Sequence, residues 1–328
     1  MALRKIQRTG GGTFFVSLPK EWAGRLGLRR GSIVSVTETA EGRLTLDPKF
    51  DVEPEPKTTV LEPGALLDRE IVGKYLLGYD VIRIEARDQI AAEQRELVRQ
   101  AARRLVGLEI IEEDYRGIVM QCLIEPASLS PERILRREYN FAAGMQRDAV
   151  AALSDGDVHL SANVVARDDE VNRLYFLLVR ILRTVIRDPR LSERLKISPI
   201  DCLDDRLVAS FVEGLGDQSV QIAETARSLK GKKLSKKLAD ALSKVHNAVL
   251  YSHENALNAL FSHDITLAES IRNKRAEVKG LIEETENLAK SEEDVNTLGG
   301  IVSATNTLQR IYELSVDIAD LVMPQLIL

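Results

Sequence analysis

Cysteine, histidine and long apolar runs are scarce in this chain of 328 residues. Its two cysteines, Cys122 and Cys202, have no partner at metal-ligand spacing, which argues against a disulfide framework and a zinc site and predicts two buried small side chains. No apolar stretch is long enough to cross a bilayer, and no signal peptide is apparent at the start. We therefore expect a cytoplasmic protein without membrane insertion.

Patterns typical of catalysis are missing as well. Residues 58–125 contain no Gly-rich phosphate loop, no nucleophile elbow and no histidine, and no nucleophile elsewhere is accompanied by a base. His246 and His253 are two helical turns apart, a rise of about 10.5 Å, which is too far for one ion. We expect these two histidines, with His159 and His263, to be surface or boundary residues, and we expect no enzymatic activity.

Charge is divided unevenly along the chain. Residues 1–47 carry eight Lys or Arg against four acidic residues, a net +4, so the remainder carries −9 of the whole-chain charge of −5. A phosphate backbone attracts the first segment and repels the rest. The alternative is a solvated basic edge that prevents aggregation between strands. The candidate DNA-binding residues are Arg4, Lys5, Arg8, Lys20, Arg25, Arg29 and Arg30.

The same segment has the pattern of a small β-rich unit. Strand-like runs at 3–7 and 13–18 flank three successive glycines, Pro19 then begins a short helix that Gly27 ends, and a second hairpin follows over 33–46. So short a segment cannot bury a core of its own, so we expect it to share one with a second copy.

This order resembles the AbrB/SpoVT family of swapped-hairpin DNA-binding domains. The resemblance covers residues 3–47 and is most specific in Ser-Leu-Pro-Lys-Glu-Trp at 17–22 and Leu-Gly-Leu-Arg-Arg-Gly at 26–31. Ser32 stands where the family usually has an acidic residue, although its hydroxyl can still bond the local backbone. The resemblance implies a dimeric swapped-hairpin β-barrel over 1–47 that binds double-stranded DNA and forms a homodimer through this domain.

A linker rich in proline and charge, residues 48–57, separates this segment from a small α+β sandwich over 58–125. The patterns predict strands at 58–61, 81–85, 109–113 and 117–124 and helices at 65–78 and 89–106. We expect a spacer or dimerisation role, with binding of a small ligand as the weaker alternative.

From residue 130 to the end the apolar spacing is helical. Six helices fit, at about 130–154, 158–188, 202–230, 233–262, 264–290 and 294–323. The third and sixth repeat one another at an offset of 96 residues, so that Leu215 and Ser219 correspond to Ile311 and Ser315. Two related three-helix bundles, over 130–230 and 231–328, are therefore expected, which makes the whole chain a multidomain α+β protein.

Two acidic helices within these bundles resemble PhoU, a family of phosphate-uptake regulators built from two three-helix bundles. The matching stretches are 167–175 and 212–224, and the resemblance spans about 130–325. It implies that acidic residues four apart on facing helices hold metal ions, often iron. Asp168, Glu213 and Asp217 match that pattern, whereas Asn172 replaces an expected carboxylate.

The residue pattern alone does not decide whether a metal ion binds. Asp168 lies in line with Val164 and Val171 on a stripe that should be buried, so it needs a metal (iron, zinc or magnesium) or an arginine. In the second repeat Arg275 takes the place of Asp168, which predicts that no second metal site exists. A solvated or salt-bridged acidic stripe is the alternative for the first.

Together these features predict a DNA-binding transcriptional regulator of phosphate uptake with a helical sensor or docking module. The alternative is a signalling adaptor that binds a phosphate transporter component or a kinase through its helices, in which the N-terminal barrel serves dimerisation only.

Overall fold

The computed structural model describes residues 3–38, 42–48, 55–292 and 294–322. They belong to two compact units, of which the first ends at Glu55 and the second begins at Pro56. Among the described residues, no helix is both long and apolar enough to span a bilayer.

The first hairpin of the N-terminal unit is short. Strand β1 (Gln7–Arg8) pairs antiparallel with β2 (Phe14–Phe15), and Gly12 takes a φ of 91° in the turn between them. Strands were expected over 3–7 and 13–18, but only two cross-strand residue pairs form.

A single helix, α1 (Lys20–Arg25), follows this hairpin directly after Pro19. Gly27 takes a φ of 65° just beyond the helix, as expected for a glycine that ends one. The hydroxyl of Ser32 accepts a hydrogen bond of 2.9 Å from the backbone N–H of Arg29, so the local bond expected of a loop hydroxyl is formed.

The second hairpin pairs β3 (Ser35–Glu38) antiparallel with β4 (Leu44–Asp47). The two hairpins are separate two-stranded sheets, so the expected barrel is not closed within one chain. None of the described side chains at 3–38 and 42–48 is buried. This unit therefore presents its apolar side chains outward rather than around a core of its own.

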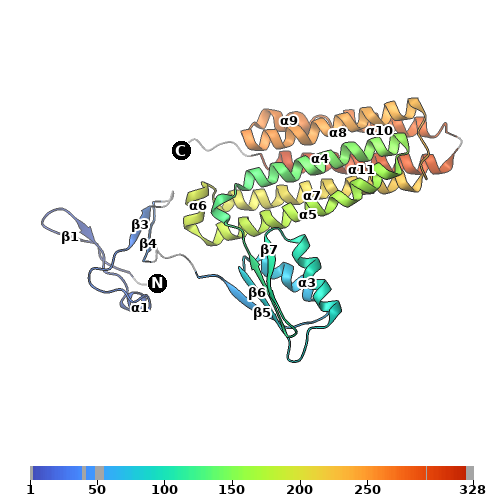
Figure 1. The fold of residues 1–328 in the computed structure, drawn as a ribbon. Helices are drawn as coiled ribbons and strands as arrows, with labels where there is room; N and C mark the ends of the chain where they lie inside the picture. The colour runs from blue at the N-terminus through green and yellow to red at the C-terminus, as the bar shows by residue number, and fades with distance from the viewer. Residues whose placement is uncertain (1–2, 39–41, 49–54, 293, 323–328) are drawn as a thin grey trace. The chain divides into compact units, whose positions relative to one another are not determined.

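The second unit begins with a four-stranded sheet (Figure 1). The strand order is β5-β6-β8-β7, with β5 and β6 parallel and the other neighbouring pairs antiparallel. The order of the strands and helices along the chain is the one expected from the sequence. They are β5 (Thr58–Leu61), α2 (Leu67–Leu76), β6 (Val81–Glu85), α3 (Ala92–Arg104), β7 (Leu108–Glu113) and β8 (Gly117–Cys122).

Strand alternation gives this sheet one covered and one open face. Ile82 and Ile84 on β6 and Ile118 and Met120 on β8 are buried against α2 and α3 in one apolar cluster. The residues between them point to the other side, where Arg83 and Glu85 are exposed.

The rest of the second unit is helical, and its long helices run side by side (Figure 1). They share one continuous apolar core to which both predicted bundles contribute. After a 3-10 turn (Pro126–Ser128), the helices are α4 (Pro131–Asp155), α5 (Val158–Arg187), α6 (Pro189–Leu195), α7 (Pro199–Ser228), α8 (Lys236–Ser262), α9 (Ile265–Arg272), α10 (Arg275–Ala289) and α11 (Val295–Asp320).

Two helices depart from the expectation. The short helix α6 occupies a connection predicted to be irregular, and the fifth predicted helix, 264–290, is divided into α9 and α10. The hydroxyl of Tyr312, which is buried, donates a hydrogen bond of 2.8 Å to the carbonyl of Ile271 just before the break. A carbonyl freed from the helical pattern therefore finds a donor on α11.

The internal repeat reappears in the hydrogen bonds of α7 and α11. Ser219 and Ser315 are both fully buried, and each hydroxyl donates to the carbonyl four residues earlier, Leu215 at 2.8 Å and Ile311 at 2.9 Å. Equivalent residues thus make equivalent bonds at the offset of 96.

One buried arginine joins the sheet to the helices. Arg180 on α5 donates through one guanidinium nitrogen to the carbonyls of Tyr75 and Tyr79, both at 2.8 Å, and through the other to Asp80 at 3.0 Å. Asp80 also accepts the backbone N–H of Lys57 at 2.8 Å. The α+β part is therefore fastened to the helical part and does not hang from it as a loose spacer.

The cysteine expectation is confirmed, since Cys122 and Cys202 are free and buried.

The histidine expectation is wrong for two of the four. His246 is 8% and His253 is 1% exposed, and the ring of His253 bonds Tyr139 at 2.9 Å and Gln146 at 2.6 Å. Helix α4 supplies both of these partners, and the spacing along α8 alone did not reveal that neighbour.

Candidate functional site

All seven candidate DNA-binding side chains are exposed on the N-terminal unit. Lys20 and Arg25 are the first and last residues of α1, and Arg8 lies on β1 with its guanidinium carbon 5.6 Å from the centre of the Phe14 ring. Arg4 and Lys5 precede β1, and Arg29 lies in the loop after α1. Several cationic side chains of this unit are therefore exposed to solvent and are not part of a buried core.

Large apolar side chains share this surface. Ile33 is 75%, Ile6 is 72%, Leu44 is 69% and Phe14 is 68% exposed. Four large apolar side chains on this unit are therefore left uncovered within one chain.

The predicted acidic residues lie on neighbouring helices of the first bundle. Asp168 on α5 is half-buried, not fully buried as its stripe suggested, and it accepts a hydrogen bond of 2.8 Å from the amide of Asn172. On α7, Glu213 is half-buried and Asp217 is exposed. Partial desolvation by the packed helices raises the pKa of all three carboxyls, even though Asp217 keeps contact with solvent, and the charge of Asp217 raises the pKa of Asp168 and Glu213 further.

Sequence reasoning missed a fourth carboxyl, Glu138 on α4. Its side chain is fully buried and neither oxygen has a hydrogen-bond partner among the described residues. Burial raises the pKa of Glu138 well above its usual range, the nearby charge of Glu213 raises it further, and Arg206 opposes the shift. A signal was present, because Glu138 interrupts the apolar spacing of Ile134, Leu135 and Ala142.

These carboxyls do not form a ready metal centre. In the part of the chain that the structure describes, no three His, Cys, Asp or Glu side chains gather around a point where an ion could sit. Asn172 also engages Asp168 as a donor, where a fourth carboxylate would have been a ligand. The negative charge of this group is therefore only partly compensated by its neighbours.

In the second repeat, an arginine of the same chain neutralises the corresponding acidic residue. Arg275 on α10 donates to Glu313 on α11 at 2.8 Å. The first repeat has Asp168 at the position that corresponds to Arg275, so its acidic residues do not have that ion pair.

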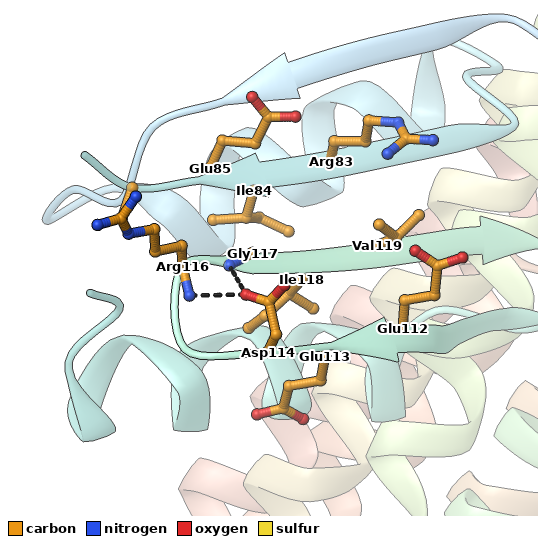
Figure 2. Close-up of a pocket in the computed structure, with 11 residues that line it drawn as sticks. Arg83, Ile84, Glu85, Glu112, Glu113, Asp114, Arg116, Gly117, Ile118 and Val119 are labelled. Carbon is orange, nitrogen blue, oxygen red and sulfur yellow. Dashed lines mark hydrogen bonds between the residues drawn. The ribbon is translucent and has the colours of Figure 1, made fainter. Parts of the chain in front are cut away.

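The open face of the sheet carries a groove of about 380 Å³ (Figure 2). Gly117 on β8 leaves its centre without a side chain, and Arg83 and Glu85 on β6 and Glu112 on β7 flank it. Asp114 accepts the backbone N–H groups of Arg116 and Gly117 at 2.7 and 2.8 Å, which lowers its pKa and fixes the turn at one end.

Comparisons with known proteins match the two units separately. Residues 7–53 match the family described as antidote-toxin recognition MazE, bacterial antitoxin, and residues 135–226 match the PhoU domain. A search of curated proteins finds no match.

Solved structures similar to the chain include two PhoU proteins. PhoU from Pseudomonas aeruginosa is 20% identical with a TM-score of 0.51 over 58% of this chain and 93% of that one. The phosphate transport system regulatory protein PhoU from Streptococcus pneumoniae is 18% identical with a TM-score of 0.50 over 58% and 91%. At these identities the likeness concerns the fold.

Proposed function

We propose that this chain, which matches the MazE antitoxin family over residues 7–53 and the PhoU domain over residues 135–226, is a DNA-binding transcriptional regulator of phosphate uptake. The observation that carries the proposal is the seven exposed basic side chains on a unit without a buried side chain among its described residues. Residues 1–47 carry a net charge of +4 against −9 for residues 48–328, so of these two parts only the first is attracted by a phosphate backbone.

Two copies are needed for this activity. Ile33 and Leu44 are exposed in a single chain and would be covered if two N-terminal units paired into one barrel. A two-fold dimer would present Arg4, Lys5 and Arg8 twice, enough for several phosphate contacts.

The test is binding to duplex DNA across a salt series with the full chain. Replacing Arg4, Lys5 and Arg8 with Ala leaves phosphates without a cation, so binding weakens and the slope of log K against log salt flattens by about 0.9 for each phosphate that is no longer neutralised. The matched control replaces Lys236, Lys237 and Lys244, three exposed cations of the second unit, and leaves the slope as it was. An unaltered slope in the first variant would remove those three residues from the interface.

The helical part of the second unit is proposed to sense phosphate status or to bind a partner protein. A ligand or partner bound there would change how the two N-terminal units are presented to DNA, and so change which half-sites they fit. The partly compensated carboxyls Asp168, Glu213 and Asp217 are proposed as a weak cation site for iron, zinc or magnesium. Calorimetric titration with each ion, against Asp217→Asn, tests it; no heat from any ion removes the site.

A second candidate function is supported by the extent of the PhoU similarity, which covers more than nine-tenths of both solved structures. In it, the chain is an adaptor that binds a phosphate transporter component or a kinase, and the N-terminal units only hold two copies together. Capture of a transporter component by the full chain, with no DNA shift at low salt, would favour the adaptor.

A further inference from the structure

The open face of the four-stranded sheet is complementary to itself. Cross-strand pairing aligns Arg83 on β6 with Val119 on β8, and Val119 with Glu112 on β7. The three side chains thus form one row across the sheet with a cation at one side, an apolar residue in the middle and an anion at the other (Figure 2). Arg83 and Glu112 are exposed.

We propose that this face binds the same face of a second copy, with the two-fold axis running parallel to the strands over Val119. That axis exchanges the two sides of the sheet and lays Arg83 over Glu112 of the partner subunit, and Glu112 over the partner's Arg83. An axis perpendicular to the strands would instead lay Arg83 over itself. The charge pattern therefore selects one orientation of an isologous interface.

Three further carboxylates lie near this row on one chain, and a fourth, Glu109 on β7, is exposed in line with Gln121 and Val81, so the axis lays it over Val81 of the second copy. Glu113, next to Glu112, is held at 2.6 Å by Arg95, and Asp114 is satisfied by backbone N–H groups of its own turn. Glu85, one row nearer that turn, lies in line with Gly117 and Asp114, so the axis lays it over Asp114 of the second copy, whose carboxylate is held by its own turn. The hollow over Gly117 leaves room for this approach.

The face is too poor in apolar area to hold two free chains together. Its apolar residues are few, with Val60 53% and Val119 9% exposed. The inference therefore rests on the proposed pairing of the N-terminal units, because the ten-residue linker 48–57 then supplies the high effective concentration at which a weak, charge-matched contact forms.

The experiment uses the full chain with Gln121→Cys, which lies on the open face of β8 under the axis and is more exposed than Val119, while the native Cys122 and Cys202 are buried. Packed sheets are about 10 Å apart, so a short bismaleimide should bridge the two engineered thiols across the axis. The matched control is Val60→Cys, on the same face but two strands from the axis. Its two copies would be about 19 Å apart across the strands, and it should cross-link at least fivefold less.

Charge exchange provides the decisive comparison. In the Gln121→Cys background, Arg83→Glu or Glu112→Arg alone should reduce the cross-linked fraction at least fivefold, because like charges then meet, and the two together should restore it. Unchanged cross-linking in both single variants, or equal cross-linking from Val60→Cys, overturns the proposal. A dimer by sedimentation that does not cross-link at Gln121→Cys overturns this face alone. A monomer shows instead that the N-terminal pairing fails.

Discussion

At the scale of single residues, the buried carboxyl of Glu138 is unusual because neither of its oxygens has a hydrogen-bond partner among the described residues. An acid whose pKa is raised by folding keeps its proton where the unfolded chain has lost it. Its contribution to stability is therefore complete below the unfolded pKa of about 4.3 and declines as the pH rises toward the folded value.

We expect Glu138→Gln to raise the free energy of unfolding at pH 7 by about 1–3 kcal/mol, because the amide has no charge to bury. The gain should shrink toward pH 4, where the carboxyl of the unsubstituted protein is largely protonated whether the chain is folded or unfolded. Urea unfolding at both pH values measures it, with the exposed Glu224→Gln as control. A loss of stability at pH 7 would mean that Glu138 is ionised and compensated.

The buried histidines predict the opposite slope. Burial, with a smaller contribution from Arg147, lowers the pKa of His246 to about 4, and the ring nitrogen Nδ1 has no partner among the described residues. A base whose pKa is lowered by folding stabilises fully above the unfolded pKa of about 6.5, and that stability is lost as the pH falls through the interval.

Replacing His246 with Gln should therefore reduce the loss of stability between pH 7 and pH 5 by about 2 kcal/mol. The measurement is chemical unfolding at the two pH values. His159→Gln, at an exposed position, should leave the difference unaltered. Equal acid sensitivity in both variants would contradict the burial of His246.

At the scale of elements, the connection between the two helical halves depends on two glycines that meet backbone to backbone. Gly156 ends α4 with a φ of 69°, and a Cβ placed on it would lie 2.5 Å from the carbonyl oxygen of Gly231. Neither the conformation nor the space allows a side chain.

We expect Gly156→Ala to lower the free energy of unfolding by at least about 1 kcal/mol. Gly280→Ala, in the middle of α10 with open space around it, should instead raise that energy by about 0.5–1 kcal/mol, because alanine favours a helix. The same substitution thus has opposite signs at two positions. A neutral result at Gly156 would show that the two loops can separate.

Periodicity predicted the elements well where one face of a helix or strand meets a core. The apolar stripes of α7 and α11 are buried as expected, from Val208 to Leu229 and from Ala304 to Val322. Periodicity could not predict the break between α9 and α10, because the carbonyl there is satisfied by Tyr312, a residue 41 positions away from Ile271.

At the scale of the whole molecule, both resemblances seen in the sequence are confirmed by the family matches. The pairing of two chains stays a prediction. Ile33 is 75% exposed in one chain, and burial in a partner would make a charge there costly.

Ile33→Asp should therefore convert a dimer into a monomer and abolish DNA binding. Val295→Asp changes a residue that is 78% exposed at the start of α11 and should alter neither property. Sedimentation equilibrium of both full-chain variants measures the mass. Two dimers of equal stability would mean that the N-terminal unit pairs through some other surface, or not at all.

The docking of the sheet on the helices lay beyond sequence reasoning for a physical reason. Arg180 interrupts a run of apolar residues on α5, and the sequence around it gives no partner for its charge. Its hydrogen-bond partners lie about a hundred positions earlier in the chain. The acidic group was foreseen at Asp168, Glu213 and Asp217, while Arg206 and Glu138 were not, because their importance comes from α4 and α7 lying together.

The bonds of Lys57 have a mechanical consequence. Its backbone N–H binds Asp80, its carbonyl accepts the N–H groups of Asp80 and Val81, and its ammonium group donates to Leu77. Asp80 is in turn held by Arg180. A force applied to the chain before Lys57 therefore acts first at the start of β5. Through Asp80 and Arg180 the same force is transmitted directly to helix α5.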